Sequence, residues 1–564
     1  MCGLAGWATT GPCPDHRALA SMAEALSHRN DGEALSAVID RQPRRAVVMA
    51  ATLSDPASGV SLALDGAILN AAELRAQLAR RGYPFKAKTD AELLLRAYQH
   101  WDKEVVKQLR GAFAFSVWDA AKERLLLARD RFGQKPLHLH QAGGALYFAS
   151  EVKALARAPG VKAEVDMGAV GDYLAIGYVR GPRTLVAGVR KLAPGTYALW
   201  QFGSLRETRY WTPPDGAAAA VDQGLPGKKQ IDIFIERLDD AVQLAMESTR
   251  PVGVLLAGGY DSAAIVALAR QHRDHVATFC AGFTDDQRSE LPAAAGLAKH
   301  FGTRHHEIVL ERRDVLAGLP QLVASRDAPV SRPADVALHL LARQAARHVK
   351  VALSGDGGDE ILGGYRRHTF LRGFAPGPRR VNGLFIIPLA DPRMPQEEGR
   401  TSALRSILYY EQTGWLADNL LERSDRMTAA ASLELRAPFL DHRLAEYVSA
   451  LPDAARVRGL STKWILRQAD RRLIGQLGIK AGLKPRKAGF RIPLGDLMRG
   501  ESRELLVDHL RGPGCLTRAY YDGKVLDRLL DEHLAARKNH EETLWTLLNL
   551  EIWHRILSAQ SRPR

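Results

Sequence analysis

The stretch L-L-A-G-G-Y-D-S, Leu255–Ser262, begins at the end of an apolar run that starts at Val252. A helical pattern follows the stretch. Its two glycines permit a tight turn, which would aim backbone N–H groups and a helix N-terminus at one point, as in anion sites. The stretch is not a Walker A loop, because the chain contains no G-x-x-x-x-G-K-[ST]. Asp261 would repel a phosphate unless a cation lay between them, so we expect Mg²⁺ to bridge Asp261 and a pyrophosphate group.

A second loop of the same kind is S-G-D-G-G-D-E, Ser354–Glu360, which follows the apolar run Val349–Leu353. Further buried-strand candidates are Val276–Phe283 and His306–Leu310, separated by helical stretches. Strand, loop and helix in repetition predict a parallel sheet covered on both faces. Two Gly-rich loops would meet at the carboxyl edge of such a sheet, where open α/β folds bind ligands. Together they predict a Mg-ATP site.

The chain before residue 213 has a different rhythm, that of short paired strands with two helices. It is followed by a Pro/Gly-rich stretch typical of a linker, and from about residue 400 the pattern is mostly helical. The predicted domains are therefore 1–212 and 230–564, joined by a linker at 213–229. The expected strands are Ala46–Thr52, Val60–Leu64, Ala112–Trp118, Arg124–Ala128 and Ala145–Ala149, and the expected helices are Ala71–Arg81 and Asp90–His100.

Composition narrows the functional class. No apolar run approaches the roughly 18–20 residues that span a bilayer, so we expect no membrane partner, and we expect no secretory leader. The net charge is +15, but basic residues are spread along the chain. We therefore expect no nucleic-acid partner. Four cysteines without a C-x-x-C pair indicate neither disulfides nor zinc and predict a cytoplasmic protein.

Cys2 follows the initiator methionine. Removal of Met1 would leave a thiol beside a free α-amino group, whose pKa of about 8 lets it act as the base. This is the arrangement of an N-terminal nucleophile, although the dipeptide by itself is equally compatible with chance.

Several longer motifs resemble one family. The first loop resembles the S-G-G-x-D-S pyrophosphate loop of the ATP-pyrophosphatase superfamily, and S-G-D-G-G-D-E-I-L-G-G-Y resembles the second nucleotide loop of glutamine-dependent asparagine synthetases. Asp425–His442 and Lys484–Pro493 are similar to that family's signatures. M-C-G-L-A-G, Arg110–Asp119, Ala128–Leu137 and Phe148–Leu155 resemble its glutaminase domain. The resemblance covers almost the whole chain in the family's order and removes the chance interpretation of Cys2.

This resemblance implies an α-β-β-α Ntn-hydrolase-type sandwich, then a parallel-sheet ATP-pyrophosphatase domain with a helical C-terminal part. It implies a ligase that adenylates a carboxylate, nominally L-aspartate, releases pyrophosphate and transfers ammonia from glutamine to give an amide and AMP. The implied cofactors are ATP and Mg²⁺, the implied partners are small-molecule substrates, and a homodimer is one expected assembly. A β-lactam-synthetase-like ligase or a related amidotransferase with another acyl substrate, free ammonia or an amine is the alternative within this fold. A non-catalytic paralogue is a third hypothesis, against which Asp261, Asp356, Asp359 and Lys487 argue.

The site residues follow from the matched motifs. The catalytic residues implied are Cys2, Asp356 and Lys487. The glutamine pocket implied comprises Thr52, Asp65, Gly66 and Asp90. The nucleotide and pyrophosphate are assigned to Leu256, Ala257, Gly258, Gly259, Ser262, Ala281, Ser354 and Gly355, and the metal to Asp261 and Asp359.

The departures from the family cluster in the glutamine pocket. Asp65 stands where the family's N-G-E-I-Y-N motif supplies an asparagine donor to the oxyanion. A carboxylate cannot donate, its charge opposes the oxyanion, and loss of one such donor costs about 10²–10³ in rate. Thr52 replaces the arginine of R-L-S, and His28–Gly32 lacks the G-P turn of H-R-G-P-D. We expect an impaired glutaminase; a rebuilt pocket using Arg44 or Arg45 is the alternative.

The synthetase half departs less. Ala257 replaces a serine of the pyrophosphate loop, and Ala328 stands where a glutamate is expected. Arg332 is a candidate ligand for a substrate carboxylate, or else a surface arginine. The acyl substrate is therefore left open by the residues themselves.

Overall fold

The computed structural model describes residues 3–11, 15, 17–29, 36–42, 45–215, 226–283, 289–370, 384–385, 387, 402–475 and 494–560. They form two compact units, one within residues 1–164 and 181–214 and the other within residues 165–180 and 215–564. No helix in these ranges is long and apolar enough to cross a membrane.

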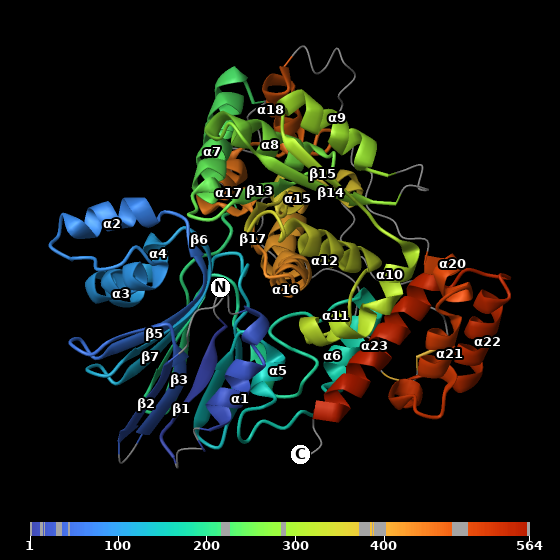
Figure 1. Ribbon diagram of the computed structural model, residues 1–564, viewed down its shortest axis with the longest axis horizontal. Coiled ribbons are helices and arrows are strands. Elements are labelled where there is room, and N and C mark those ends of the chain that lie inside the picture. The colour runs from blue at the N-terminus through green and yellow to red at the C-terminus, as the bar shows by residue number, and fades with distance from the viewer. Residues whose placement is uncertain are drawn as a thin grey trace. The chain divides into compact units, whose positions relative to one another are not determined.

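The first unit contains two six-stranded antiparallel sheets (Figure 1). One sheet has the order β10-β8-β9-β1-β3-β2, and the other has the order β12-β11-β7-β6-β5-β4. The strands are β1 (Ala5–Thr9), β2 (Ser36–Gln42), β3 (Arg45–Ala51), β4 (Leu53–Asp55), β5 (Val60–Ile68), β6 (Gly111–Asp119), β7 (Arg124–Arg129), β8 (His138–Ala142), β9 (Ala145–Ala149), β10 (Val189–Lys191), β11 (Thr196–Gln201) and β12 (Ser204–Arg209).

Alternation along β5 separates two cores in this unit. Val60, Leu62 and Leu64 join a cluster with helices α2 (Ala71–Ala79) and α3 (Asp90–Trp101), whereas Ala63 joins a cluster shared by both sheets. Helices α1 (Ala18–Glu24) and α5 (Val152–Leu155) cover the other sheet, and α4 (Val105–Gln108) lies beside α3. The layers are thus helix, sheet, sheet and helix, which confirms the predicted sandwich.

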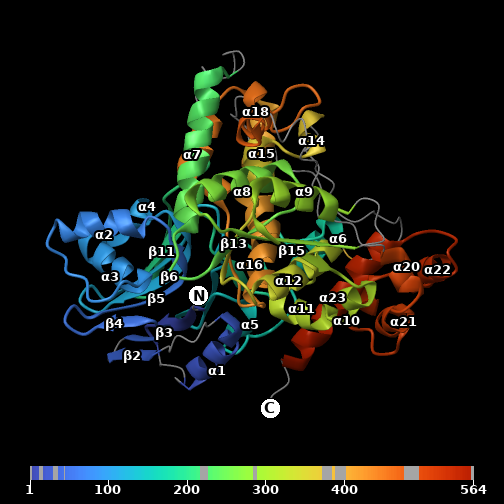
Figure 2. The same ribbon diagram turned by 45° about the horizontal axis from the view of Figure 1, so that its top comes forward.

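The second unit is built on a five-stranded parallel sheet of order β15-β14-β13-β16-β17. These strands are β13 (Val252–Leu255), β14 (Ala277–Gly282), β15 (Arg304–Val309), β16 (Val351–Leu353) and β17 (Glu434–Arg436). Helices α8 (Tyr260–His272) and α9 (Leu291–Phe301) pack on one face, and α12 (Pro333–Ala345) and α16 (Glu422–Ala429) on the other (Figure 2). The prediction of a parallel sheet covered on both faces is confirmed.

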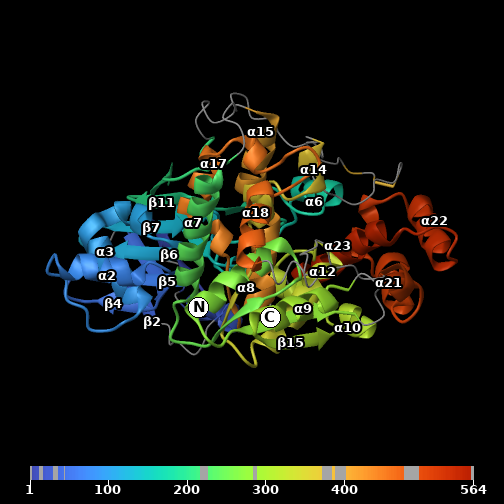
Figure 3. The same cartoon turned by 90° about the horizontal axis from the view of Figure 1, so that it is seen from above.

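The second unit contains further helices. Helices α7 (Lys228–Met246) and α18 (Trp464–Leu473) lie against α8 (Figure 3). The others are α6 (Met167–Ile176), α10 (Arg312–Ala317), α11 (Leu319–Arg326), α13 (Gly358–Leu362), α14 (Arg366–Thr369), α15 (Ala403–Tyr410), α17 (His442–Ala450), α20 (Leu494–Arg499), α21 (Arg503–Arg511), α22 (Gly523–Leu534) and α23 (Glu541–Gln560), with a π-helical stretch at Glu411–Leu421.

Helix α6 belongs to the second unit although it precedes residue 212 in the chain. The Tyr173 hydroxyl donates to the carbonyl oxygen of Thr546 in α23 at 3.2 Å, and Ile176 packs with Trp415 of the π-helical stretch. Its apolar sides are therefore buried by elements that come hundreds of residues later.

Candidate functional site

A cavity of about 620 Å³ lies at the carboxyl edge of the parallel sheet in the second unit. It gathers ten of the residues that the sequence assigned to nucleotide, metal and catalysis: Leu256, Ala257, Gly259, Asp261, Ser262, Ala281, Ser354, Gly355, Asp356 and Asp359. Gly258 belongs to the same loop. The two Gly-rich loops therefore meet as their positions after β13 and β16 require.

The first loop is braced by its own serine. Ser262 Oγ accepts from the backbone N–H of Ala257 at 3.2 Å and donates to the carbonyl oxygen of Gly259 at 3.2 Å. Gly258 has φ +68°, a conformation that L-residues rarely adopt. Helix α8 begins at Tyr260, so Asp261 lies in its first turn, where the helix dipole favours a carboxylate.

Lys463 joins the two carboxylates that the sequence assigned to a metal. Its Nζ lies 2.6 and 2.5 Å from the two carboxylate oxygens of Asp261 and 2.7 Å from Oδ1 of Asp359. Burial opposes the charge of Lys463, but the two carboxylates outweigh burial and raise the pKa of its ammonium. The residue has φ +50°, a strained conformation of the kind that clusters at functional sites.

Three glycines leave room for this arrangement. A Cβ at Gly358 would lie 2.3 Å from Asp261 Oδ1, and one at Gly364 would lie 1.8 Å from Asp359 Oδ1. A Cβ at Gly355 would lie 2.7 Å from Asp261 Cβ. Only glycine therefore allows the backbone to pass so close to the two carboxylates.

The carboxylates of Asp261 and Asp359 converge on one cationic nitrogen, and two converging carboxylates are a ligand set that suits a divalent cation. Mg²⁺ is typically bound by one or two carboxylates, substrate phosphates and water. Within the described ranges no group of three or more His, Cys, Asp or Glu side chains is arranged for a metal. A cation at Asp261 and Asp359 would thus depend on phosphate oxygens and water for its other ligands.

The other acids of the second loop differ in their surroundings. Asp356 Oδ2 accepts from Ser424 Oγ at 2.8 Å, and Asp356 remains part of the cavity wall. Glu360 is only 1% exposed and accepts from the Tyr365 hydroxyl. Burial, together with Asp359 and Glu411, raises the pKa of Glu360 to about 8. Asp356 is thus the more exposed of the two acids of this loop that Lys463 does not contact.

Lys463 is the residue that sequence reasoning missed. It lies in S-T-K-W-I-L-R, a stretch with no glycine loop or acidic partner to mark it. Its role depends on α18 packing against α8, which no local pattern shows. The predicted Lys487 and Cys2 lie outside the described residues, as do Asn30–Gly32 and Arg44.

In the first unit, all four residues predicted for the glutamine pocket either lie in β5 or form hydrogen bonds with it. Asp65 and Gly66 belong to this strand, and the Asp90 Oδ2 accepts from the backbone N–H of Ile68 at 2.9 Å. Thr52 donates its backbone N–H to Leu62 O at 2.9 Å and its hydroxyl to the same atom at 3.3 Å. Thr52 therefore offers no replacement for the guanidinium of the family's R-L-S motif.

Gly66 is dictated by the neighbouring strand. Its φ is +115°, and a Cβ would lie 2.0 Å from the carbonyl oxygen of Ala112 in β6. The residue following Asp65 must therefore be glycine for steric reasons, independently of any ligand.

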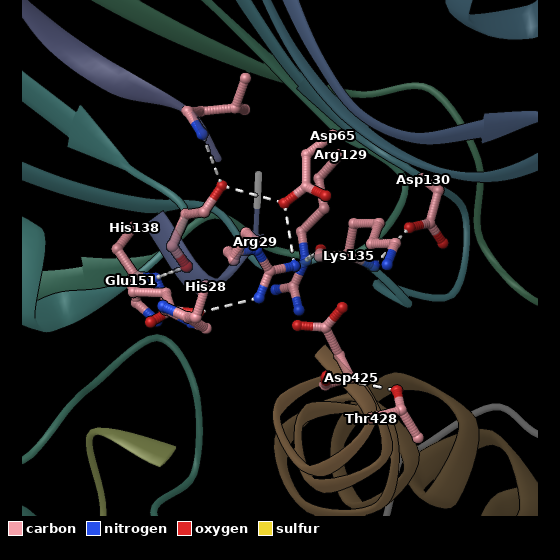
Figure 4. A network of polar contacts seen from close by, with 12 residues as sticks. His28, Arg29, Asp65, Arg129, Asp130, Lys135, His138, Glu151, Asp425 and Thr428 are labelled. Carbon is pink, nitrogen blue, oxygen red and sulfur yellow. Dashed lines mark hydrogen bonds and ion pairs between the residues drawn. The ribbon is translucent and has the colours of Figure 1, made fainter. Parts of the chain in front are cut away.

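Asp65 is completely buried and paired with Arg29 (Figure 4). Arg29 Nη2 lies 3.0 Å from Asp65 Oδ2, and its Nη1 donates to Glu151 Oε1 at 2.9 Å. Ser150 Oγ donates to the same Asp65 oxygen at 3.1 Å and accepts from the N–H of Leu4 at 2.9 Å. The charge that would oppose an oxyanion is thus compensated by a guanidinium, although the amide donor of the family is still missing.

Two family models match this chain. The Asparagine synthase model matches residues 234–555, and the Glutamine amidotransferase domain model matches residues 1–211. The chain belongs to the asparagine synthase family. As a member it is an enzyme of the carbon–nitrogen ligase type, and the family uses ATP and other small-molecule substrates.

Curated relatives agree over most of the chain. A "Putative asparagine synthetase [glutamine-hydrolyzing]" of Mycobacterium tuberculosis (strain ATCC 25618 / H37Rv) is 33% identical, covering 89% of this chain and 85% of the relative. "Asparagine synthetase [glutamine-hydrolyzing] 1" of Bacillus subtilis (strain 168) is 30% identical, covering 87% and 85%. The solved glutamine phosphoribosylpyrophosphate amidotransferase from B. subtilis is 18% identical with a TM-score of 0.27, covering 54% of this chain and 65% of that chain.

We predict that Asp65→Ala strongly lowers the free energy of unfolding, because it breaks the buried ion pair with Arg29. Removal of this carboxylate leaves the Arg29 guanidinium with one acid fewer in a dry site, which typically costs about 3–5 kcal/mol. Glu24→Ala is the matched control, because it removes an exposed pair with Arg157 and should cost less than about 1 kcal/mol. The measurement is the urea-unfolding midpoint of both variants against the wild type. Equal midpoints for the two variants would contradict the buried pair.

Proposed function

We propose that this protein is an ATP-dependent amide-forming ligase. It adenylates a carboxylate, nominally L-aspartate, releases pyrophosphate, and transfers ammonia to the activated carbonyl to give the amide and AMP. The observation that carries the proposal is the meeting of two Gly-rich loops, two carboxylates and Lys463 in one cavity. Adenylation turns a poor leaving group into a good one, which is the task such a site has to perform.

Different residues are proposed to act on the nucleotide with its pyrophosphate and on the α-phosphate. The loop from Leu256 to Ser262, with Ala281, Ser354 and Gly355, binds the nucleotide and its pyrophosphate. Asp261 and Asp359 would hold Mg²⁺, which would supply positive charge to phosphate groups of ATP. Lys463, already at these carboxylates, donates to a phosphate oxygen as pyrophosphate leaves, and Lys487 is proposed to stabilise charge at the α-phosphate.

We propose that Asp356 acts in the second half-reaction. Its Oδ2 is held by the Ser424 hydroxyl, which leaves Oδ1 to accept a proton from the nitrogen nucleophile. Transfer of that proton to Asp356 as nitrogen attacks would make the amine a competent nucleophile while AMP departs. We therefore propose Asp356 as the general base of amide formation.

We further propose that the glutaminase half works slowly. Cys2 is the proposed nucleophile, and Asp90 the proposed ligand of the glutamine α-amino group. The pairing of Asp65 with Arg29 offsets the adverse charge, but the carboxylate cannot act as the missing oxyanion donor. Free ammonia should then drive the synthetase better than glutamine does.

The test is AMP and pyrophosphate release by the Met-trimmed protein with Mg-ATP and aspartate, in parallel with glutamine, ammonium chloride or neither. We expect turnover with ammonium, slower turnover with glutamine, and loss of only the glutamine reaction in Cys2→Ala. Asp65→Asn should raise the glutamine rate relative to the ammonium rate, because an amide restores a donor. Equal glutamine and ammonium rates in the wild type would contradict the impaired glutaminase. Absence of AMP with every donor and with other carboxylic acids would contradict the ligase.

Lys463→Met is predicted to lower the ammonium-driven rate of AMP formation by roughly 10²–10³-fold. The change removes the cation that offsets Asp261 and Asp359 and that donates to the departing pyrophosphate. Lys299→Met, an exposed change in α9, is the control and should leave the rate unchanged. A Lys463→Met rate within twofold of the wild type would rule out this role.

A further inference from the structure

One unbroken helix of the second unit changes its winding in the middle. It begins as α15 (Ala403–Tyr410), continues as the π-helical stretch Glu411–Leu421 and ends as α16 (Glu422–Ala429). π-Helices are rare, occur mostly as single turns inside α-helices, and are frequent at functional sites. The stretch in this chain has 11 residues and is therefore longer than one turn.

Residues near both ends of the stretch contact the second Gly-rich loop. Close to its start, Gln412 Nε2 donates to the backbone carbonyl oxygen of Glu360 at 3.1 Å. Just beyond its end, Ser424 Oγ donates to Asp356 Oδ2 at 2.8 Å. Asp359, one of the two proposed Mg²⁺ ligands, lies between Asp356 and Glu360 in the sequence. The two hydrogen bonds therefore hold the loop on either side of this carboxylate.

An α-helical winding would separate these two contacts. Gln412 and Ser424 are twelve positions apart, which in an α-helix amounts to about 18 Å along the axis and about 120° around it. Hydrogen bonds from residue i to i+5 put more residues into each turn, so a π-helix brings the two side chains closer along the axis and nearer to a common face. Trp415 and Leu420 show the same effect, since both line the cavity although an α-helix would place them about 140° apart.

The chain that follows the loop is held by the neighbouring residue of the stretch. Glu411 is fully buried and accepts from His368 Nε2 at 2.9 Å and from Arg367 Nε at 2.7 Å. His368 Nδ1 accepts from the backbone N–H of Tyr365 at 3.2 Å, so Nε2 is the nitrogen that carries the ring proton. Consecutive residues of the stretch, Glu411 and Gln412, therefore hold α14 and α13.

We propose that the π-helical stretch positions the second Gly-rich loop for binding of Mg²⁺ with the nucleotide, and that Gln412 is the positioning residue that sets the place of Asp359. This inference rests on the proposed ligase function, which assigns ATP and Mg²⁺ to the cavity. Gln412 is buried and is not among the residues that line the cavity, so it acts on the site through α13.

The mechanism of this positioning is a hydrogen bond to the end of a short helix. Carbonyl groups in the last turn of a helix have no partner within the helix. The Gln412 amide supplies a donor to one of them, that of Glu360, and the same helix carries Asp359 in its first turn. A shift of α13 would move the Asp359 carboxylate relative to that of Asp261, and the two would no longer converge on one cation.

The test measures binding of α,β-methylene-ATP, in which cleavage next to the α-phosphate is blocked, to the whole protein by calorimetry, with Mg²⁺ and with EDTA. Gln412→Met removes the amide donor and keeps a side chain of similar length. Thr413→Val is the matched control in the same stretch, because the Thr413 hydroxyl donates to the carbonyl oxygen of Tyr409 in its own helix, at 2.9 Å.

A second pair of variants tests the winding itself. Deletion of Gly414 removes one residue from the stretch and turns Gln412 by about 100° relative to Ser424. Gly414→Ala is the matched control, because it keeps the number of residues and the nearest atom to an added Cβ is 3.8 Å away, in Tyr410. Urea unfolding shows which variants fold, and Gln412→Met decides alone if the deletion does not.

We expect Mg²⁺ to strengthen nucleotide binding by the wild type. Gln412→Met should weaken binding with Mg²⁺ by about 3- to 10-fold and leave binding with EDTA unchanged. The folded Gly414 deletion should weaken binding with Mg²⁺ by about tenfold or more, whereas Thr413→Val and Gly414→Ala should match the wild type.

Four results would overturn the inference. They are wild-type binding that Mg²⁺ does not strengthen, binding with Mg²⁺ that Gln412→Met leaves unchanged, equal losses with Mg²⁺ and with EDTA in Gln412→Met, and a folded Gly414 deletion that binds like the wild type.

The AMP assay separates this inference from the ligase proposal. AMP formation at a rate that Gln412→Met and the folded Gly414 deletion leave unchanged would uphold the ligase and overturn the role of Gln412. Loss of Mg²⁺-dependent binding in Gln412→Met, without AMP formation by the wild type from any acid, would uphold the role of Gln412 and overturn the ligase.

Discussion

The contact between the Lys463 ammonium and the carboxylates of Asp261 and Asp359 is the interaction on which the second unit's site depends. It joins the first turn of α8, the first turn of α13 and the residue before α18 at a single nitrogen atom. The carboxylates of Asp261 and Asp359 would repel each other without the ammonium between them. The buried ammonium of Lys463 would in turn be costly without the carboxylates, so each group requires the others. The close glycines and the strained backbone of Lys463 are the steric consequences of this one requirement.

The first unit solves a related problem with a different cation. Arg29 is fully buried between Asp65 and Glu151, and the latter also contacts His28 at 3.0 Å and Lys153 at 2.6 Å. The aspartate that breaks the family's oxyanion motif is therefore part of a compensated network. The charge of Asp65 is therefore compensated, and the cost that we propose for this departure is the lost hydrogen-bond donor rather than an unpaired charge.

Much of the fold was predictable because it has strong local signals. Ala145–Ala149 was predicted as a strand with the same bounds as β9, and the two Gly-rich loops were placed correctly after β13 and β16. The three-residue strand β17 was missed, since Glu434-Leu-Arg436 has no apolar run and is fixed by pairing with β16. Cys280 is one of the four cysteines for which the sequence indicates neither a disulfide nor a zinc site. It is buried, and burial raises the pKa of its thiol to about 12.

The site was predictable only where a motif carried it. Acidic side chains within glycine loops marked Asp261, Asp356 and Asp359, whereas Lys463 and Arg29 depend on which elements meet in space. The helix of residues 167–176 shows the same limit, since its place in the second unit is set by burial against Trp415 and α23. Long-range packing, which local pattern does not encode, therefore accounts for the residues that were missed.

The most direct measurement of the central claim follows oxygen from the acid to AMP. The protein is incubated with Mg-ATP, ammonium and aspartate that carries ¹⁸O in its side-chain carboxylate, and the products are examined by ³¹P NMR. The account predicts AMP with one ¹⁸O on phosphorus, because amide formation breaks the carbonyl carbon–oxygen bond of an acyl-adenylate. Unlabelled AMP, or ADP with ¹⁸O in inorganic phosphate, would contradict it.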